Sequence, residues 1–345
     1  MDERLTTAIA ESLTTVESTT AIAQSTSDTA ATAAQAATTA VEATTTAAIP
    51  GIHIGGSVVP YAWAVAAAIA LLALIGIAVA FALKKRGKSA PVEVIGGAGL
   101  RIGNLHNIGK RDSQQDAFGI SDLSDAALTA RKGVLAVVAD GIGGLTGGAK
   151  ISSIVTSHFL QGFPALPEEL EPCEQLLRLT LGANDLALLH AQGEMSGSTV
   201  VAVLLRGQQL HFVSVGDSRI YLLHGGALVQ LTREHTLASQ LDEDAARGLI
   251  SVQEARSDRQ RGSLTSYIGM ENLTLIDRSL KPIQLSPGDK ILLMTDGVFG
   301  TLSEDELLGL VTGAEPFAAS QALEQAVLDK AKPNQDNFTA IILEI

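Results

Sequence analysis

Hydrophobic and polar positions follow three different patterns along this chain of 345 residues. Over residues 1–59 the sequence is mostly Ala, Thr and Ser, with few large apolar side chains. Such a segment buries too little surface to offset the conformational entropy that folding costs. We therefore expect residues 1–59 to form a disordered or weakly helical tail. An adhesive or sensing role and a plain spacer role both remain open for it.

The second pattern is an uncharged apolar run within residues 60–83. No charged residue occurs between Tyr61 and Leu83, and at the helical rise this stretch spans roughly 34 Å, enough to cross a bilayer core. A cluster of Lys and Arg follows directly, within the linker 84–97. The positive-inside rule places that basic linker in the cytoplasm. The sequence thus predicts a single-pass protein of the cell membrane, with the tail outside and the C-terminal part in the cytoplasm.

The third pattern fills residues 98–345, where strand blocks alternate with helix blocks. Strand patterns are apolar or have period two, and they lie at 99–105, 116–121, 133–139, 200–205, 209–215, 219–223, 228–231, 272–280, 290–295 and 338–344. Helical patterns have a period near 3.6, and they lie at 147–163, 171–192, 237–257, after the capping box 303–306 and at 316–331. Strands in two groups with helices in pairs predict one layered α+β domain.

Two of these strands run into an aspartate that is followed by glycine. The strand at 133–139 leads into Asp140 and Gly141, and the strand at 290–295 leads into Asp296. Glycine lets the backbone approach a ligand closely and leaves its carbonyl free to face that ligand. One such motif alone is an ordinary Asp-Gly turn. Two of them, far apart in sequence, predict strand-end carboxylates that share one cation site.

Three further aspartates stand at turns beside apolar runs, namely Asp116, Asp217 and Asp336. Taken singly, each is more often a solvated turn residue. Together with Asp140 and Asp296 they would form an oxygen-rich site that needs no histidine or thiolate. Ligands of this kind favour Mg²⁺ or Mn²⁺ over zinc.

Composition narrows the function classes. The formal charge of −13 argues against a nucleic-acid partner, which would call for a basic face. A single cysteine, Cys173, excludes an internal disulfide framework and a CxxC zinc or redox motif. We expect Cys173 to lie in a helix as a small buried side chain.

The order of the motifs resembles the metal-dependent protein phosphatases, the type 2C family of Ser/Thr phosphatases, over residues 98–345. The matching stretches are Arg111 with Gln114-Gln115-Asp116, Val138 to Gly144, Gly197-Ser198-Thr199, Gly216 to Arg219, Thr295-Asp296-Gly297 and Asp336-Asn337. The resemblance implies a β-sandwich of two antiparallel sheets flanked by helix pairs, in α-β-β-α layers, preceded here by a single transmembrane helix. It also implies hydrolysis of phosphoserine and phosphothreonine in proteins by a water that two Mn²⁺ or Mg²⁺ ions activate.

The resemblance assigns metal-binding roles to four residues. Asp140 would bridge two metal ions, and the Gly141 carbonyl would bind one of them. Asp296 and Asp336 would hold the other ion. Loss of any of these carboxylates would remove a charged oxygen ligand from a centre that needs several.

Three more residues take supporting roles by the same resemblance. Asp116 would orient metal-bound water, Asp217 would serve a third, weaker metal, and Arg111 would clamp the substrate phosphate with its planar guanidinium. The chain departs from the family at Ile142, where many eukaryotic members have a histidine that is a candidate acid. It departs again at Gln115, where some members have a metal-binding glutamate. The leaving-group proton would then come from metal-bound water or another residue.

Residues 237–262 resemble the flap of bacterial members, which would select protein substrates, although a plain surface helix pair fits equally well. The leading prediction is a membrane-anchored phosphatase whose partners are phosphorylated proteins and an opposing Ser/Thr kinase. One alternative is a pseudophosphatase that acts as a membrane sensor or scaffold, but a scaffold does not need clustered negative charge. Another alternative is an enzyme that acts on a small phosphorylated metabolite.

Overall fold

The structure is a computed structural model that describes residues 51–54, 57–60, 94–95, 99–143, 147–191 and 196–345. The chain divides into two units, Met1–Ala82 and Leu83–Ile345. Apart from Pro60, the predicted transmembrane segment 60–83 lies outside the described residues, as does most of the linker 84–97. Within the part of the chain that is described, no helix combines the length and apolarity needed to span a membrane.

In the first unit the described residues form a hairpin. Strand β1 (Gly51–Ile54) pairs antiparallel with β2 (Ser57–Pro60), with Gly51 opposite Pro60. These strands fall at the end of the range 1–59, so the expectation of a disordered or weakly helical tail does not hold there. The isoleucines of β1 and the valines of β2 are residue types that favour extended backbone.

The second unit contains two antiparallel sheets. The six-stranded sheet has the order β11-β10-β14-β15-β4-β3, with β3 Val94–Ile95, β4 Arg101–Asn107, β10 Arg219–His224, β11 Ala227–Gln230, β14 Lys290–Met294 and β15 Phe338–Glu344. The seven-stranded sheet has the order β12-β9-β8-β6-β5, and β13 and β7 pair with β9 and β6. Its strands are β5 Asp116–Ile120, β6 Val134–Ile142, β7 Gly197–Ser198, β8 Val200–Arg206, β9 Gln209–Val215, β12 Asp277–Arg278 and β13 Ile283–Gln284.

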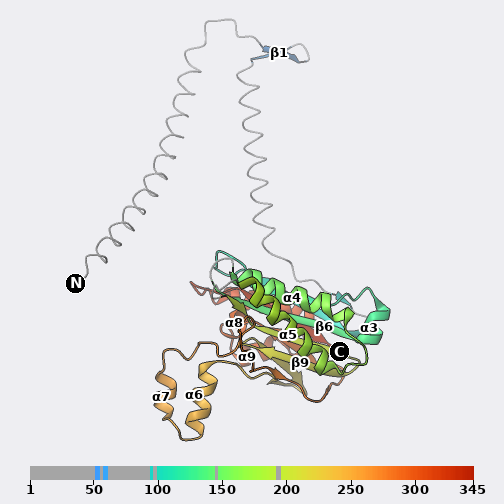
Figure 1. Ribbon diagram of the computed structural model, residues 1–345. Coiled ribbons are helices and arrows are strands. Elements are labelled where there is room, and N and C mark those ends of the chain that lie inside the picture. The colour runs from blue at the N-terminus through green and yellow to red at the C-terminus, as the bar shows by residue number, and fades with distance from the viewer. Residues whose placement is uncertain (1–50, 55–56, 61–93, 96–98, 144–146, 192–195) are drawn as a thin grey trace, which may run out of the picture. The chain divides into compact units, whose positions relative to one another are not determined.

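Helices cover the outer face of each sheet. The described helices are α3 Ala126–Lys132, α4 Gly147–Ala165, α5 Pro172–Ala191, α6 Leu237–Ala246, α7 Val252–Ser257, α8 Asp296–Phe299, α9 Glu304–Val311 and α10 Pro316–Asp329. The pair α4 and α5 packs on the seven-stranded sheet, and α9 and α10 pack on the six-stranded sheet. The pair α6 and α7 projects from the body of the domain (Figure 1).

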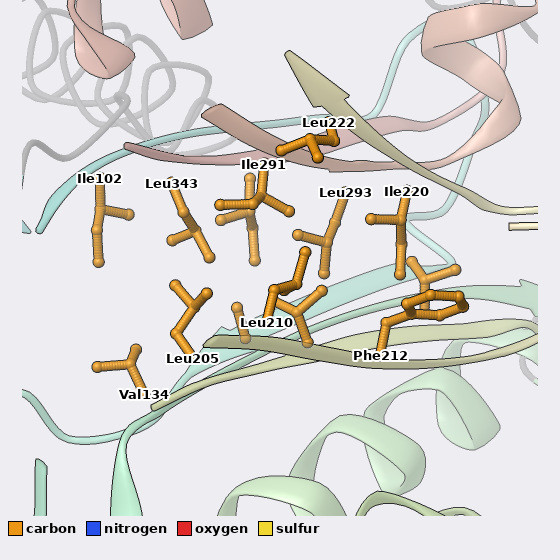
Figure 2. Packing of buried hydrophobic residues seen from close by; sticks show 14 of the residues in the cluster. Ile102, Val134, Leu205, Leu210, Phe212, Ile220, Leu222, Ile291, Leu293 and Leu343 are labelled. Carbon is orange, nitrogen blue, oxygen red and sulfur yellow. The ribbon is translucent and has the colours of Figure 1, made fainter. Parts of the chain in front are cut away.

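Alternation along the central strands produces this layering. In β15, Phe338 and Ile342 face the helices α9 and α10, whereas Ile341 and Leu343 face the space between the sheets. Figure 2 shows Leu343 and other side chains of the six-stranded sheet meeting those of the seven-stranded sheet. Full burial of one such branched side chain stabilises the fold by about 1.5–3 kcal/mol. The predicted sandwich of two antiparallel sheets flanked by helices is therefore confirmed.

Most predicted elements are present, and the differences have local causes. The strand expected at 272–280 shrinks to the two-residue β12, because Leu275 and Leu280 face solvent, with 43% and 77% of their surface exposed. The helical range 237–257 is interrupted at Gly248, as its sequence predicted, because a φ of 74° does not fit a helix. The short helices α3 and α8 carry too few residues for a clear period and were not predicted. Cys173 lies in α5 as expected, but it is only half-buried.

Candidate active site

Four aspartates line one cavity of about 480 Å³. Asp140 lies in β6, Asp217 in the turn between β9 and β10, Asp296 at the start of α8, and Asp336 just before β15. Arg111 also lines this cavity. The carboxylates therefore come from both sheets, and the sandwich brings together the residues that the sequence predicted as one site.

The sequence predicted that Asp140 lies at the end of a strand. In the structure it lies within strand β6. The strand continues to Ile142 and pairs there with β7, so that Gly141 stands opposite Ser198. The Thr199 amide donates to the Asp140 carbonyl at 2.8 Å, and the Gly141 amide donates to the Gln115 carbonyl at 3.1 Å. Because the backbone is paired on both sides, Asp140 is fixed relative to its neighbours.

Gly141 is required by a close backbone approach. A Cβ atom at this position would lie 2.3 Å from the Gly148 carbonyl oxygen and 2.7 Å from the Gln115 carbonyl oxygen, distances that no side chain tolerates. Gly148 belongs to the first turn of α4, and a Cβ there would in turn lie 2.8 Å from the Gly141 carbonyl carbon. The two glycines thus let the helix start directly against the strand that carries Asp140.

Asp116 is buried directly behind the cavity. It stands opposite Asp140 in the β5–β6 pair and has 5% of its surface exposed. Its Oδ2 accepts hydrogen bonds from the hydroxyls of Thr295, at 2.9 Å, and Thr339, at 2.7 Å. Its Oδ1 is buried and has no hydrogen-bond partner among the residues that the structure describes. The sequence did not predict a role for either threonine. For Thr339, the sequence did offer one signal of a functional role, namely a polar residue within the mainly apolar strand β15.

Asp336 and Arg111 form an ion pair at the rim of the cavity. The Arg111 Nη2 donates to Asp336 Oδ2 at 2.6 Å. The other oxygen of Asp336 accepts from the Asn337 amide at 2.8 Å. Asn337 also braces the loop that carries Arg111, because its side-chain amide donates to the carbonyls of Ile108 and Ser113. Asn337 was part of a predicted motif, but only the structure shows its bracing contacts.

Burial and like charge act on the aspartates together. Burial raises the pKa of Asp116 to about 7 against the hydrogen bonds from its two threonines, and the charges of Asp296 and Asp336 raise it further. Burial also raises the pKa of Asp217 to about 7, with Asp296 adding to the effect. The pKa of Asp140 lies well above its ordinary value, and that of Asp296 is also raised, again chiefly through burial. Burial and mutual repulsion therefore favour the protonated form of these carboxyls unless a positive charge beyond that of Arg111 meets them.

This cluster fits divalent cations. Within the described part of the chain, Asp296 Oδ1, like Asp116 Oδ1, is buried without a hydrogen-bond partner. Such burial is costly unless a positive group meets the oxygen. Among the described residues, no three His, Cys, Asp or Glu side chains stand close enough to form a ready metal-binding group. One of the aspartates, Asp336, is held by Arg111 instead. Oxygen ligands of this kind suit Mn²⁺ or Mg²⁺.

The end of the predicted flap also contributes to the lining of the cavity. Gly262, Leu264 and Tyr267 line the cavity beside Ile142. Helices α6 and α7 precede this segment, and Leu249 and Val252 between and within them expose 69% and 55% of their surface. The range 237–262 is therefore an exposed helix pair whose end borders the site.

Fold and cavity together fit one class of protein, a phosphate-ester hydrolase that works with divalent metal ions. The family model for protein phosphatase 2C matches residues 105–332. The serine/threonine phosphatase stp of Listeria monocytogenes is 29% identical over 221 residues, which cover 61% of this chain and 84% of that protein. The chain belongs to the protein phosphatase 2C family.

Solved structures agree with this assignment. The S. agalactiae serine/threonine phosphatase is 25% identical, has a TM-score of 0.62, and is matched over 71% of this chain and 99% of its own. The catalytic domain of the serine/threonine protein phosphatase PstP, solved in complex with two manganese ions, shares the fold with 24% identity and a TM-score of 0.56, over 71% of this chain and 97% of its own. The predicted family and activity class, a serine/threonine phosphatase, are confirmed.

Proposed function

We propose that this protein hydrolyses phosphoserine and phosphothreonine in phosphorylated proteins, using two Mn²⁺ or Mg²⁺ ions, and so reverses the action of a Ser/Thr kinase. The observation that carries this proposal is the convergence of carboxylates from both sheets on one cavity beside an arginine. The names of the relatives and the manganese ions in PstP support it. A scaffold without turnover gains nothing from buried carboxylates that raise each other's pKa.

The residues divide the work as follows. Asp140, the Gly141 carbonyl, Asp296 and Asp336 would hold two ions, and Asp217 would serve a third, weaker one. Bound ions of this kind supply an activated water and neutralise charge on the phosphoryl group during an in-line displacement. Asp116, which stands opposite Asp140 in the β5–β6 pair, would orient metal-bound water.

Arg111 can exchange its ion pair with Asp336 for one with the substrate phosphate. Its side chain and that of Asp336 expose 54% and 40% of their surface, and an exposed ion pair contributes only about 0–1 kcal/mol. The guanidinium can therefore leave Asp336 at little cost and clamp two phosphate oxygens. Its departure also frees Asp336 Oδ2 for a cation.

The test is an assay of the full-length protein in detergent. We expect Mn²⁺-dependent release of phosphate from a phosphothreonine peptide, which a chelator abolishes. Small phosphorylated metabolites should be hydrolysed with a kcat/KM well below that of the peptide. The reverse preference would favour the metabolite enzyme, and no turnover with either substrate would favour the scaffold.

Arg111→Ala is expected to raise KM for the phosphopeptide and to lower kcat, together by about 10-fold or more in kcat/KM. The clamp strengthens as charge develops on the phosphoryl group, so both constants should change. Lys110→Ala, which removes the neighbouring exposed cation, serves as the matched control. Steady-state kinetics that do not distinguish the two variants would place Arg111 outside the reaction.

We further propose that the protein is anchored in the cell membrane by residues 60–83, with the phosphatase domain in the cytoplasm. Support comes from the sequence, namely the uncharged run from Tyr61 to Leu83 and the basic cluster after it. The opposing kinase and its substrates would then meet the phosphatase at the inner membrane surface.

Protease added to intact cells is expected to cut only the N-terminal tail. The basic cluster after Leu83 is costly to translocate, so the phosphatase domain should be protected until the cells are opened. Immunoblots with tags at the two ends would measure this. Cleavage of the C-terminal tag from outside would contradict both the orientation and a role in reversing cytoplasmic kinases.

A further inference from the structure

A chain of hydrogen bonds runs from His106 to Asp116 through the space between the two sheets. His106 on β4 stands directly opposite Thr339 on β15, and its Nδ1 lies 2.9 Å from the Thr339 Oγ1. That hydroxyl lies 2.7 Å from Asp116 Oδ2, on the other sheet. His106 belongs to none of the motifs that carry the resemblance to the phosphatase family.

The directions of these hydrogen bonds follow from the groups involved. A hydroxyl has one proton, and Thr339 donates it to the Asp116 carboxylate. Thr339 can therefore only accept from His106, so the His106 Nδ1 must carry a proton. Burial lowers the pKa of His106, which favours the neutral ring with a single N–H. The Gln114 side-chain amide nitrogen, a donor, lies 3.1 Å from His106 Nε2 and 3.3 Å from Nδ1. With the proton on Nδ1, this amide donates to Nε2.

A second hydroxyl completes the arrangement around Asp116. Thr295 Oγ1 donates to the same Oδ2 at 2.9 Å and accepts from the Thr339 amide at 3.0 Å. Oδ2 is thus held by two donors, whereas Oδ1 is buried without a partner beside the carboxylates of the cavity. Two donors on one oxygen fix the plane of the carboxylate and leave one defined oxygen for the reaction.

We infer that His106 is a positioning residue of the phosphatase reaction, which fixes Asp116 by donating its Nδ1–H to Thr339. The inference rests on the proposed function, in which Asp116 would orient metal-bound water. Outer partners of this kind typically change activity or metal affinity by about 10–100-fold when they are removed. The ring nitrogen, rather than the ring itself, carries this role.

The competing explanation is that His106 only packs. Its ring stacks on Phe118, with the centroids 5.1 Å apart and the planes inclined by 55°. Packing needs an aromatic ring but no Nδ1–H. His106→Phe keeps a ring and removes the donor, whereas His106→Asn removes the ring and places an amide N–H near the position of Nδ1. The two variants therefore separate the two explanations.

The experiment compares the full-length variants on a phosphothreonine peptide at saturating Mn²⁺. We expect His106→Phe to lower kcat about 10–100-fold with little change in KM, and His106→Asn to recover most of the loss. Thr339→Val should resemble His106→Phe, and Thr339→Ser should resemble the wild type. Full activity in His106→Phe with loss in His106→Asn would overturn the inference, as would equal losses in both. Circular dichroism verifies the fold of each variant.

Two readouts do not depend on turnover. In ¹⁵N-histidine-labelled protein, the His106 signal, assigned with His106→Asn, should show the proton on Nδ1, and a proton on Nε2 alone would overturn the inference. Calorimetric titration should show weaker Mn²⁺ binding in His106→Phe than in His106→Asn, and equal affinities would count against the role. A wild-type protein without turnover would refute the proposed function instead, and these two measurements would still decide on His106.

Discussion

Asp140→Asn is expected to lower kcat by several orders of magnitude. The residue stands where both ions of the proposed centre would meet, and asparagine offers one neutral oxygen in place of a charged carboxylate. Asp296→Asn should have a similar effect, since its buried Oδ1 has no partner other than a prospective cation. Both variants are to be measured at saturating Mn²⁺ with the phosphothreonine peptide.

Asp185→Asn provides the matched control, because this aspartate is exposed on α5 and does not line the cavity. It should keep wild-type kinetics, which would show that the loss does not follow from removal of negative charge as such. Near wild-type rates for either Asp140→Asn or Asp296→Asn would contradict the metal site assigned to these residues.

Asp140→Asn should stabilise the metal-free protein, although it lowers kcat. The folded-state pKa of Asp140 is raised, so the native state binds this proton more tightly than the unfolded state does. The stability that goes with the protonated form is fully present below the ordinary pKa near 3.8 and is lost as the pH rises through the raised value. Without metal, the wild type should therefore become progressively less stable than Asp140→Asn above about pH 4.

The difference between the two proteins is the quantity to measure. Buried histidines such as His211 and His235 have a lowered pKa and favour folding as the pH rises, but they contribute equally to both proteins. In the presence of chelator we expect the variant to melt several degrees above the wild type at pH 7.5, and the gap to close near pH 4. Mn²⁺ should raise the Tm of the wild type only. If Asp140→Asn were less stable than the wild type at pH 7.5 without metal, the raised pKa of Asp140 in the folded protein would be contradicted.

The sequence predicted those features that a local pattern of residue types determines, namely the strands, the aspartates of the cavity and one helix start. Alternating and continuous apolar runs predicted the strands of both sheets. A strand buried on one face alternates apolar and polar residues, and a strand buried on both faces is apolar throughout. The aspartates Asp140, Asp296 and Asp336 could be selected because each adjoins a buried strand, and the sandwich brings all three to one cavity. The capping box at Ser303 also predicted a helix start correctly.

The remaining features depend on pairings between distant segments. The ion pair of Arg111 with Asp336 joins residues 225 positions apart, and no local pattern indicates it. The continuation of β6 past Asp140 depends on β7, which contributes only two residues. Thr339 is a polar residue within an apolar strand pattern, and His106 directly follows the strand predicted at 99–105. Neither feature predicts their contact, which depends on a register between strands that only the folded sheet establishes.

The contact between Gly141 and Gly148 limits how this enzyme can diversify. Any side chain at either position collides with backbone atoms, and backbone cannot swing aside as the end of a side chain does. Positions 141 and 148 are therefore restricted to glycine. Leu264 and Tyr267, which line the same cavity, are only half-buried and lie under no such backbone constraint. Changes in phosphoprotein specificity are therefore expected in the segment after the exposed helix pair, whereas Gly141 and Gly148 should remain unchanged.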